Sequence, residues 1–304
     1  MIKRSRRVAP RLLLAALLGA LSLCAAARDA TPPTPLLWKV SDADNSVYLL
    51  GTFHLLRADD YPLDARIDAA FADAETLVLE LPPAELTSPA LGAQFAMAGL
   101  REDGRTLSAA LGAADWARLQ AAAGGLGLPE PALEQMDAWF VALALSLQGL
   151  SSEGLDPALG LDRHLAERAA QAGKRTRGLE TAAEQIALFD TLPEATQLAQ
   201  LRDALARAGD GSTPIEARRL HAQWRAGDAD ALYTGLAAEM RQSDPAFYAR
   251  MNTDRNAAWA IELRALLDGS SSDDALVAVG SLHLLGPEGL VQRLEALGYR
   301  VQRL

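Results

Sequence analysis

Cysteine and histidine are scarce in this chain. It has one cysteine and four histidines among 304 residues, so it cannot form a disulfide within itself or a metal site built from thiolates. Aromatic residues make up only 5%, yet half of the chain is apolar, enough to bury one large core or two closely joined lobes. We therefore expect the fold to depend on its hydrophobic core.

Several catalytic signatures are also missing. The sequence has no HExxH helix of the common zinc proteases, no Walker loop and no G-x-S-x-G elbow. Ser281 is near His283, but neighbours on one side of a strand rarely bring an imidazole to a hydroxyl, so a serine mechanism is not favoured.

Long apolar runs are absent after the N-terminal segment. There, five basic residues precede the apolar run Leu12 to Leu23, which is followed by Cys24 and three alanines. This pattern predicts a secretory signal peptide over 1–27. No later run reaches the about 18 residues of a membrane helix, so we expect a periplasmic or secreted mature chain without one. Lipoprotein anchoring through Cys24 is less favoured because the bulky Leu23 precedes it. Ser5-Arg6-Arg7 resembles a twin-arginine signal, which the following Ala9-Pro10 fits poorly.

Basic residues are too few for a polyanion-binding protein. Removing residues 1–27 lowers Lys+Arg from 29 to 24 against 39 Asp+Glu, a net charge of −15. Such a surface argues against nucleic acid and anionic lipid as partners. Prolines at 32, 33 and 35 predict an extended leader over residues 28–36, and residues 37–304 are expected to form a single domain.

Apolar runs predict a strand, helix, strand unit near the start of this domain. Residues 47–50 and 77–79 are the strands, and residues 67–74 place apolar side chains on one helix face. A crossover of this length makes the strands parallel, so His54 and Glu80 are expected at the same edge of the sheet.

The C-terminus repeats this plan. A strand over 275–279, a helix over 287–297 and a strand over 299–302 are predicted, while residues 84–267 are mostly helical. We therefore expect an α/β fold with a mixed sheet core. Gly51-Thr52-Phe53-His54-Leu55-Leu56 returns as Gly280-Ser281-Leu282-His283-Leu284-Leu285. If the two units share a sheet or face each other, His54, Glu80 and His283 converge on one composite site.

The glycines and hydroxyls of these repeats have predicted roles. Each glycine permits a sharp or positive-φ turn and close backbone approach, and Thr52 or Ser281 could hold a backbone group or an imidazole nitrogen. In the helical middle, Gly160-Leu161-Asp162 opens a helix and Thr181 with Glu184 forms a capping box. Asp162 and Glu180 are interpreted first as bracing residues, and His164 and His221 as surface residues.

These motifs together resemble the TraB/GumN family, which is related to the Tiki metalloproteases. The resemblance rests on the two histidine motifs, Glu80 at a strand end, Gly160-Leu161-Asp162, Gly178-Leu179-Glu180-Thr181 and Arg255-Asn256 before Trp259. It implies a fold akin to the erythromycin esterase and ChaN-like proteins. It also implies a divalent metal at His54, Glu80 and His283, with Arg255 nearby. The family is mixed: Tiki proteins cleave peptides, TraB-like members shut down peptide pheromones, and many GumN-like members have no settled activity.

This set of side chains supports a hydrolytic mechanism. Two neutral imidazoles and a carboxylate suit zinc, manganese, cobalt or iron and leave a position open for water. Arg255 would orient a substrate carboxylate or stabilise an oxyanion, while Glu80 could instead act as a general base. The alternatives without a functional role are a structural histidine pair, a solvated Glu80, and an Arg255 that pairs with Asp254 or with a neighbouring helix.

The sequence therefore predicts an exported metal-dependent hydrolase that cleaves a peptide or protein substrate. We expect Glu80 and Arg255 to be the catalytic residues and His54, Glu80 and His283 to be the metal ligands. The alternative is a non-catalytic periplasmic binding or regulatory protein that uses the same crevice for a peptide, a metal or haem. The oligomeric state is not specified by these patterns.

Overall fold

The computed structural model of the protein describes residues 31–269 and 271–304. Within this range, Pro32–Leu304 forms one compact unit. The predicted signal peptide lies outside the described residues. Residues 31–36 of the predicted leader contain no helix or strand, and they end in the fully buried Leu36. None of the helices in the described ranges has the length and apolar character needed to cross a bilayer.

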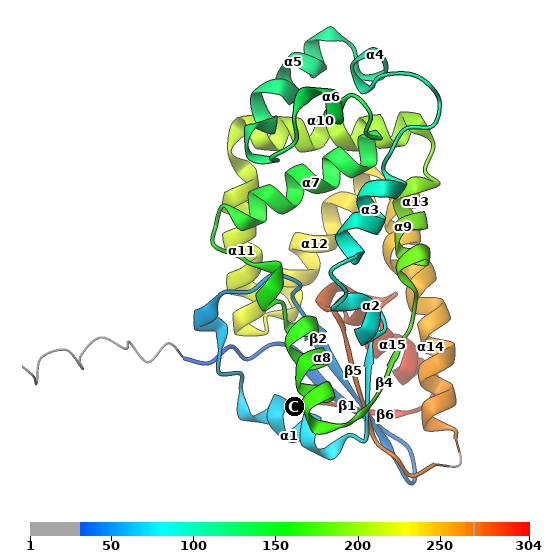
Figure 1. Ribbon diagram of the computed structural model, residues 1–304. Helices are drawn as coiled ribbons and strands as arrows, with labels where there is room; N and C mark the ends of the chain where they lie inside the picture. The colour runs from blue at the N-terminus through cyan, green and yellow to red at the C-terminus, as the bar shows by residue number, and fades with distance from the viewer. Residues whose placement is uncertain (1–30, 270) are drawn as a thin grey trace, which may run out of the picture. The chain divides into compact units, whose positions relative to one another are not determined.

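A six-stranded mixed sheet lies in the lower half of this unit in the view of Figure 1, and helices make up the upper half. Its order is β4-β3-β5-β2-β1-β6; neighbours from β4 to β2 pair parallel, and β1 is antiparallel to both β2 and β6. The protein is thus an α/β protein, as expected. The strands are β1 (Leu37–Ser41), β2 (Ser46–Thr52), β3 (Thr76–Leu79), β4 (Arg175–Gly178), β5 (Ala275–Gly280) and β6 (Arg300–Arg303).

The two predicted units share this one sheet, with β5 inserted between β2 and β3. Thr52 lies opposite Gly280, and Leu79 lies opposite Ala278. The carboxyl ends of the three strands therefore meet at one edge, where loops of parallel α/β sheets commonly hold ligands.

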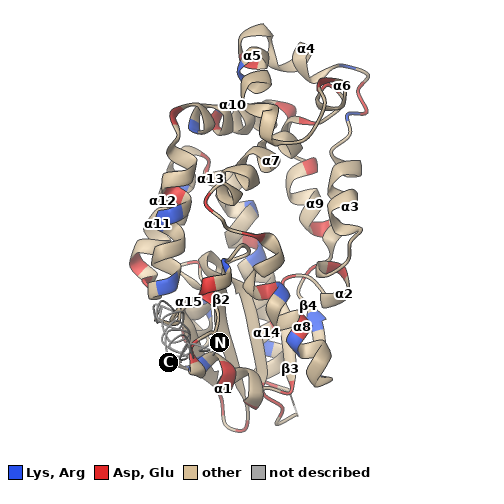
Figure 2. Ribbon diagram, turned by 60° about the vertical axis from the view of Figure 1, so that its left-hand side comes forward, with Lys and Arg blue, Asp and Glu red and all other residues tan. Residues whose placement is uncertain are grey.

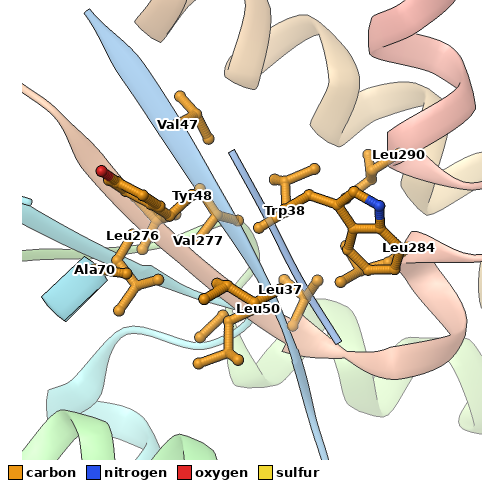
Figure 3. Packing of buried hydrophobic residues seen from close by; sticks show 14 of the residues in the cluster. Leu37, Trp38, Val47, Tyr48, Leu50, Ala70, Leu276, Val277, Leu284 and Leu290 are labelled. Carbon is orange, nitrogen blue, oxygen red and sulfur yellow. The ribbon is translucent and has the colours of Figure 1, made fainter. Parts of the chain in front are cut away.

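Both faces of the sheet are covered. All seven residues of β2 and five of the six residues of β5 are buried, the pattern of strands in the middle of an α/β fold. Trp38, Leu284 and Leu290 pack together at one side of these strands (Figure 3). Burying a large apolar side chain contributes roughly 1.5–3 kcal/mol, so this core is the main source of stability for the sheet edge.

Helices make up most of the remaining chain. They are α1 (Ala65–Asp73), α2 (Pro83–Leu86), α3 (Leu91–Ala98), α4 (Leu107–Leu111), α5 (Ala113–Ala122), α6 (Glu130–Leu133), α7 (Ala138–Ser151), α8 (Leu161–Ala172), α9 (Ala182–Asp190), α10 (Glu194–Asp210), α11 (Ser212–Ala226), α12 (Ala229–Ser243), α13 (Pro245–Tyr248), α14 (Asp254–Leu267) and α15 (Leu290–Ala296). Short 3₁₀ turns include η1 (Ala58–Asp60), η3 (Pro157–Leu159) and η5 (Ser281–Leu284), and η4 (Ala249–Thr253) is a π-helical turn.

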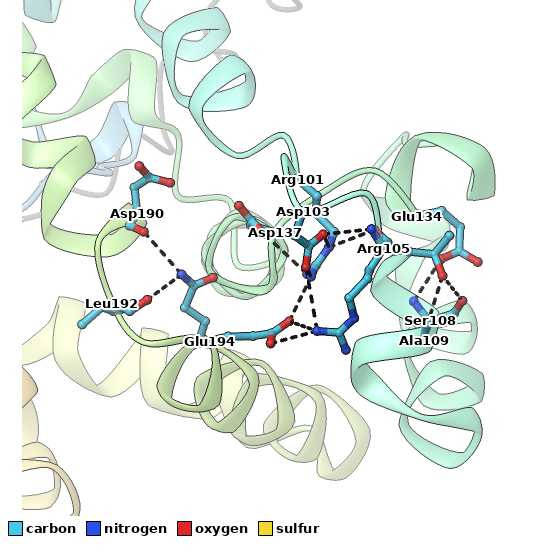
Figure 4. Close-up of polar contacts among 12 residues, drawn as sticks. Arg101, Asp103, Arg105, Ser108, Ala109, Glu134, Asp137, Asp190, Leu192 and Glu194 are labelled. Atoms are coloured by element: carbon cyan, nitrogen blue, oxygen red, sulfur yellow. Dashed lines mark hydrogen bonds and ion pairs between the residues drawn. The ribbon is translucent and has the colours of Figure 1, made fainter.

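A second hydrophobic cluster lies within the helical region. Its members come mainly from α4, α5, α7 and α10, and include Leu107, Val141 and Leu201. Beside it, the Arg101 side chain is only 3% exposed and pairs with Asp103, Asp137 and Glu194 (Figure 4). Of the six strands, β2, β3 and β5 carry no charged residue (Figure 2), whereas β1, β4 and β6 do.

Three local predictions need correction. His221 is 3% exposed rather than a surface residue, because the fully buried Asp60 accepts a hydrogen bond from it at 2.8 Å. The last helix begins at Leu290 instead of 287, because Gly289 has an extended backbone (φ −70°, ψ 155°) and is the N-cap residue. Neither Gly51 nor Gly280 has a positive φ. Glycine fits at both positions because atoms of neighbouring residues lie close to where a Cβ would be.

Candidate functional site

Three predicted site residues meet at Gly280, the last residue of β5. A Cβ atom on this glycine would lie 3.2 Å from Glu80 Oε1, 3.4 Å from His54 Nε2 and 3.6 Å from His283 Cδ2. The Gly280 N–H donates to Glu80 Oε1 at 2.8 Å. The absence of a side chain at Gly280 therefore leaves the space in which these three groups face one another.

His54 is oriented by the start of α8. Asp162 Oδ2 lies 2.8 Å from His54 Nδ1, which leaves Nε2 directed toward Gly280. The contact requires Gly160, where a Cβ would lie 2.2 Å from the His54 carbonyl oxygen, so any other residue would push α8 away. The Gly160-Leu161-Asp162 motif thus combines close packing with a carboxylate that orients an imidazole.

His283 is oriented by the first turn of α14, which follows the π-helical turn η4. Its Nδ1 lies 2.7 Å from Asn256 Oδ1, and its Nε2 lies 3.0 Å from an Arg255 NH1 that can only donate. The ring is therefore the neutral tautomer with the proton on Nδ1. Trp259 packs against it with ring centroids 4.4 Å apart.

Arg255 is the hub of an ion-pair network. Glu180 accepts from its Nε at 2.7 Å and from its NH2 at 2.9 Å, and Glu80 Oε2 accepts from NH2 at 2.8 Å. Gln185 donates to Glu80 Oε2 at 3.2 Å. Arg255 is 9% exposed, and this satisfied, bidentate pairing offsets the cost of burying its charge.

The two imidazoles titrate in opposite directions. Asp162 raises the pKa of His54 to about 9 through its charge and hydrogen bond. Burial and, to a lesser degree, the positive charge of Arg255 beside the ring lower the pKa of His283 to about 3. Burial alone would raise the pKa of Glu80, but Arg255 and the two histidines outweigh it and hold that pKa well below its usual range.

The structure brings all four predicted residues, His54, Glu80, Arg255 and His283, into one centre. Their predicted roles stay predictions. Arg255 pairs with Glu80 and Glu180 rather than with Asp254. Asp162 and Glu180, interpreted from sequence as bracing residues, contact the functional side chains directly. Asn256 was part of the Arg255-Asn256 motif but was given no role, although a buried asparagine on a helix needs a hydrogen-bond partner.

The hydroxyls following the two glycines behave differently from one another. Ser281 Oγ donates to the Thr52 carbonyl at 3.0 Å and joins the two strand exits. The buried Thr52 Oγ1 has no hydrogen-bond partner. Neither hydroxyl contacts an imidazole nitrogen. The Nδ1 atoms of His54 and His283 are hydrogen-bonded to Asp162 and Asn256 instead.

The donor atoms fit a divalent metal only after one rearrangement. In the described ranges no group of three His, Cys, Asp or Glu is already arranged to hold a metal ion. Each imidazole nevertheless has its Nδ1 engaged by an oxygen atom, as metal-ligating histidines commonly do. Arg255 NH1 lies on the His283 Nε2, so this contact has to open before His54, Glu80 and His283 can act together.

A cleft opens beside this centre. It has a volume of about 690 Å³, and His54 and Glu80 are among its lining residues. Its walls are mostly apolar. A cavity of about 440 Å³ at the opposite end of the sheet is lined by Ser41 and Tyr299 and contains none of the predicted residues.

The fold and this centre define an α/β protein whose polar site lies at the carboxyl end of a parallel strand set. The chain belongs to the TraB/PrgY/gumN family, whose sequence model matches residues 36–303. It is 27% identical over 247 residues to "Uncharacterized protein YbaP" of Escherichia coli (strain K12), an alignment that covers 81% of this chain and 87% of that protein. The YbaP protein of Shigella flexneri matches to the same extent. No solved structure gives a significant match.

Proposed function

We propose that this protein is an exported metal-dependent hydrolase that cleaves peptide bonds, with His54, Glu80 and His283 holding a divalent metal. The supporting observation is the meeting of His54 Nε2, Glu80 Oε1 and the His283 ring at Gly280, each imidazole being oriented by a second residue. The proposal includes a relation to the Tiki metalloproteases and a fold akin to the erythromycin esterase and ChaN-like proteins.

The chain's own residues would divide the work. A divalent metal such as zinc, manganese or cobalt supplies Lewis-acid chemistry and makes hydroxide accessible near neutral pH. To hold the metal, His54 would release its Nε2 proton to solvent, while Asp162 would keep the ring in place through Nδ1. Arg255, held by Glu180, stabilises negative charge on the substrate carbonyl oxygen or orients a substrate carboxylate. Glu80, ionised by its neighbours, serves as ligand or as general base.

A second candidate is a non-catalytic binding protein that holds a peptide, a metal or haem. It is favoured by the hydrogen bond from Arg255 NH1 to His283 Nε2. If this bond persists, the proposed ligand set is reduced to His54 and Glu80, too few for a catalytic metal with three protein ligands.

The deciding experiment measures bound metal and peptide hydrolysis on the same purified protein. His54→Ala and His283→Ala are each expected to lower metal affinity at least about tenfold and to abolish hydrolysis. His164→Ala is the matched control, because His164 contacts the Tyr61 ring and lies outside the centre. Full metal binding in both site variants would overturn the metal assignment. Stoichiometric metal without turnover of a broad peptide library would support the binding protein.

A further inference from the structure

The cleft beside the centre is built largely from apolar side chains. It runs from His54 and Glu80 to α3 and α7, and its walls include Leu81, Leu86, Leu91, Phe95 and Leu147. Leu147 is 40% exposed. Clefts of this size commonly bind ligands through apolar walls and a few polar groups at one end, and here the polar end is the candidate centre.

One wall, α3, is an apolar helix that the fold does not bury. Its sequence is Leu-Gly-Ala-Gln-Phe-Ala-Met-Ala, none of its residues is buried, and Met97 is 68% exposed. A surface helix normally turns its apolar face to the core. Exposed apolar surface of this kind marks a binding site more often than a lone exposed residue does.

This wall is nevertheless held in place. The next residue, Gly99, lies so close to α7 that a Cβ there would be 2.6 Å from Phe140 Cβ. Asp137 at the start of α7 donates its N–H to the Gly99 carbonyl at 2.7 Å. The α3 surface therefore stands at a set distance from α7, as one side of a groove must.

The charged residues that line the cleft indicate what kind of ligand it accepts. Three carboxylates line it, those of Glu80, Asp156 and Asp162, against two cations, Arg163 and the imidazolium of His54. Arg163 is itself paired with Glu167. Carboxylates in excess repel an acidic ligand, so the cleft fits a neutral or basic chain with large apolar side chains.

We infer that this cleft selects peptides with bulky aliphatic or aromatic side chains beside the segment that lies over the centre, and that α3 and α7 are the specificity walls. Cleavage of that segment rests on the proposed function, whereas binding does not. Because each large side chain is taken from water into the cleft, a Leu-Phe peptide should bind about tenfold or more tightly than an Ala-Ala peptide.

Gly92 provides a way to fill the cleft without disturbing the fold. It lines the cleft on α3, and a Cβ there would meet nothing within 4 Å. Gly92→Phe therefore adds a ring at the lining of the cleft without a clash at its Cβ. Gly209→Phe is the matched control, because Gly209 is an exposed glycine of α10 with nothing within 4 Å and lies outside the cleft.

The test is calorimetric titration with three blocked hexapeptides that carry Leu-Phe, Ala-Ala or Asp-Glu at their centre. Wild type and Gly209→Phe should bind the Leu-Phe peptide best, and Gly92→Phe should bind it about tenfold or more weakly. Leu147→Gln, a change at a partly exposed side chain, should weaken the same peptide. Equal binding of all three peptides, or equal weakening in the Gly209→Phe protein, would overturn the inference.

Measuring hydrolysis of the same peptides separates the two proposals. Preferred binding of the Leu-Phe peptide without cleavage supports the specificity walls and counts against the hydrolase. Cleavage of all three peptides at equal rates supports the hydrolase and refutes the specificity walls.

Discussion

The two copies of the Gly-x-x-His motif differ far more in surroundings than in sequence. His54 has 57% of its side chain exposed, whereas His283 has 8%. The carboxylate of Asp162 holds one ring, and the amide oxygen of Asn256 holds the other. The first copy therefore favours a charged imidazole that faces the cleft, and the second a neutral one inside the protein.

This difference shows that the repeated motif sets position and the neighbours set chemistry. Each strand exit delivers a histidine to the same sheet edge because β2 and β5 are paired in register. A neighbouring carboxylate then favours the imidazolium of His54, while burial and Arg255 keep His283 neutral. Equivalent residues can thus have distinct roles in one centre.

The largest contrast is expected between alanine substitutions of the two motif glycines. Gly280→Ala puts a methyl group between His54 Nε2 and Glu80 Oε1, so metal affinity should fall at least about tenfold with less than about 1 kcal/mol of lost stability. Gly51→Ala would crowd Ser281 Oγ at 2.8 Å and the Leu36 Cβ at 3.2 Å, and should cost about 1–3 kcal/mol.

Equilibrium dialysis with zinc and denaturant unfolding measure the two effects. The comparison fails if Gly280→Ala binds zinc as wild type does, or if Gly51→Ala is as stable as wild type. Gly124→Ala is the control, because a Cβ there would meet nothing within 4 Å.

The opposite pKa shifts give the next contrast, measured by NMR titration of the imidazoles in EDTA-treated protein. His54 should titrate near pH 9 and His283 near pH 3, against an ordinary value of 6.5. Asp162→Asn should lower the pKa of His54, and Asn256→Asp should raise that of His283. Unchanged values in these two variants would show that the partners do not set the shifts.

The effects on stability have opposite signs. His54 keeps its proton in the folded state up to about pH 9, so its contribution is complete below pH 6.5 and is lost as pH rises to about 9. His283 stays neutral when folded, so its contribution is complete above pH 6.5 and is lost as pH falls toward about 3. Unfolding of His54→Gln across the alkaline range should lack the first dependence.

The smallest contrast concerns the two hydroxyls. Ser281→Ala removes a buried hydrogen bond to the Thr52 carbonyl and should cost about 1 kcal/mol. Thr52→Val removes a buried hydroxyl without a partner, so stability should stay the same or rise slightly. Thermal unfolding of both variants checks this, and a larger loss for Thr52→Val would contradict the assignment.

Much of the sheet edge was predictable because its signals are local. Short apolar runs ending in glycine predicted β2 and β5, and the crossover rule placed His54 and Glu80 together. The capping box of Thr181 and Glu184 was equally readable and is present at the start of α9.

Other features depended on contacts between distant segments. No pattern in the sequence indicated that β5 lies between β2 and β3, because strand order is a property of the whole sheet. His221 looked like a surface residue until Asp60 supplied its buried partner. The orienting partners Asp162 and Asn256 were likewise visible only when α8 and α14 were placed against the strand exits.

The sequence by itself determined the α/β class and the strand exits that carry His54, Glu80 and His283, since periodicity and turn chemistry act over a few neighbouring residues. Arg255 was expected from the resemblance to the TraB/GumN family. The tertiary structure alone decided that β5 joins the two units, that Arg255 lies on His283 and that the two imidazoles differ in charge. Charge and hydrogen bonding at a buried site depend on which distant groups pack against it, and packing of the complete chain sets those distances.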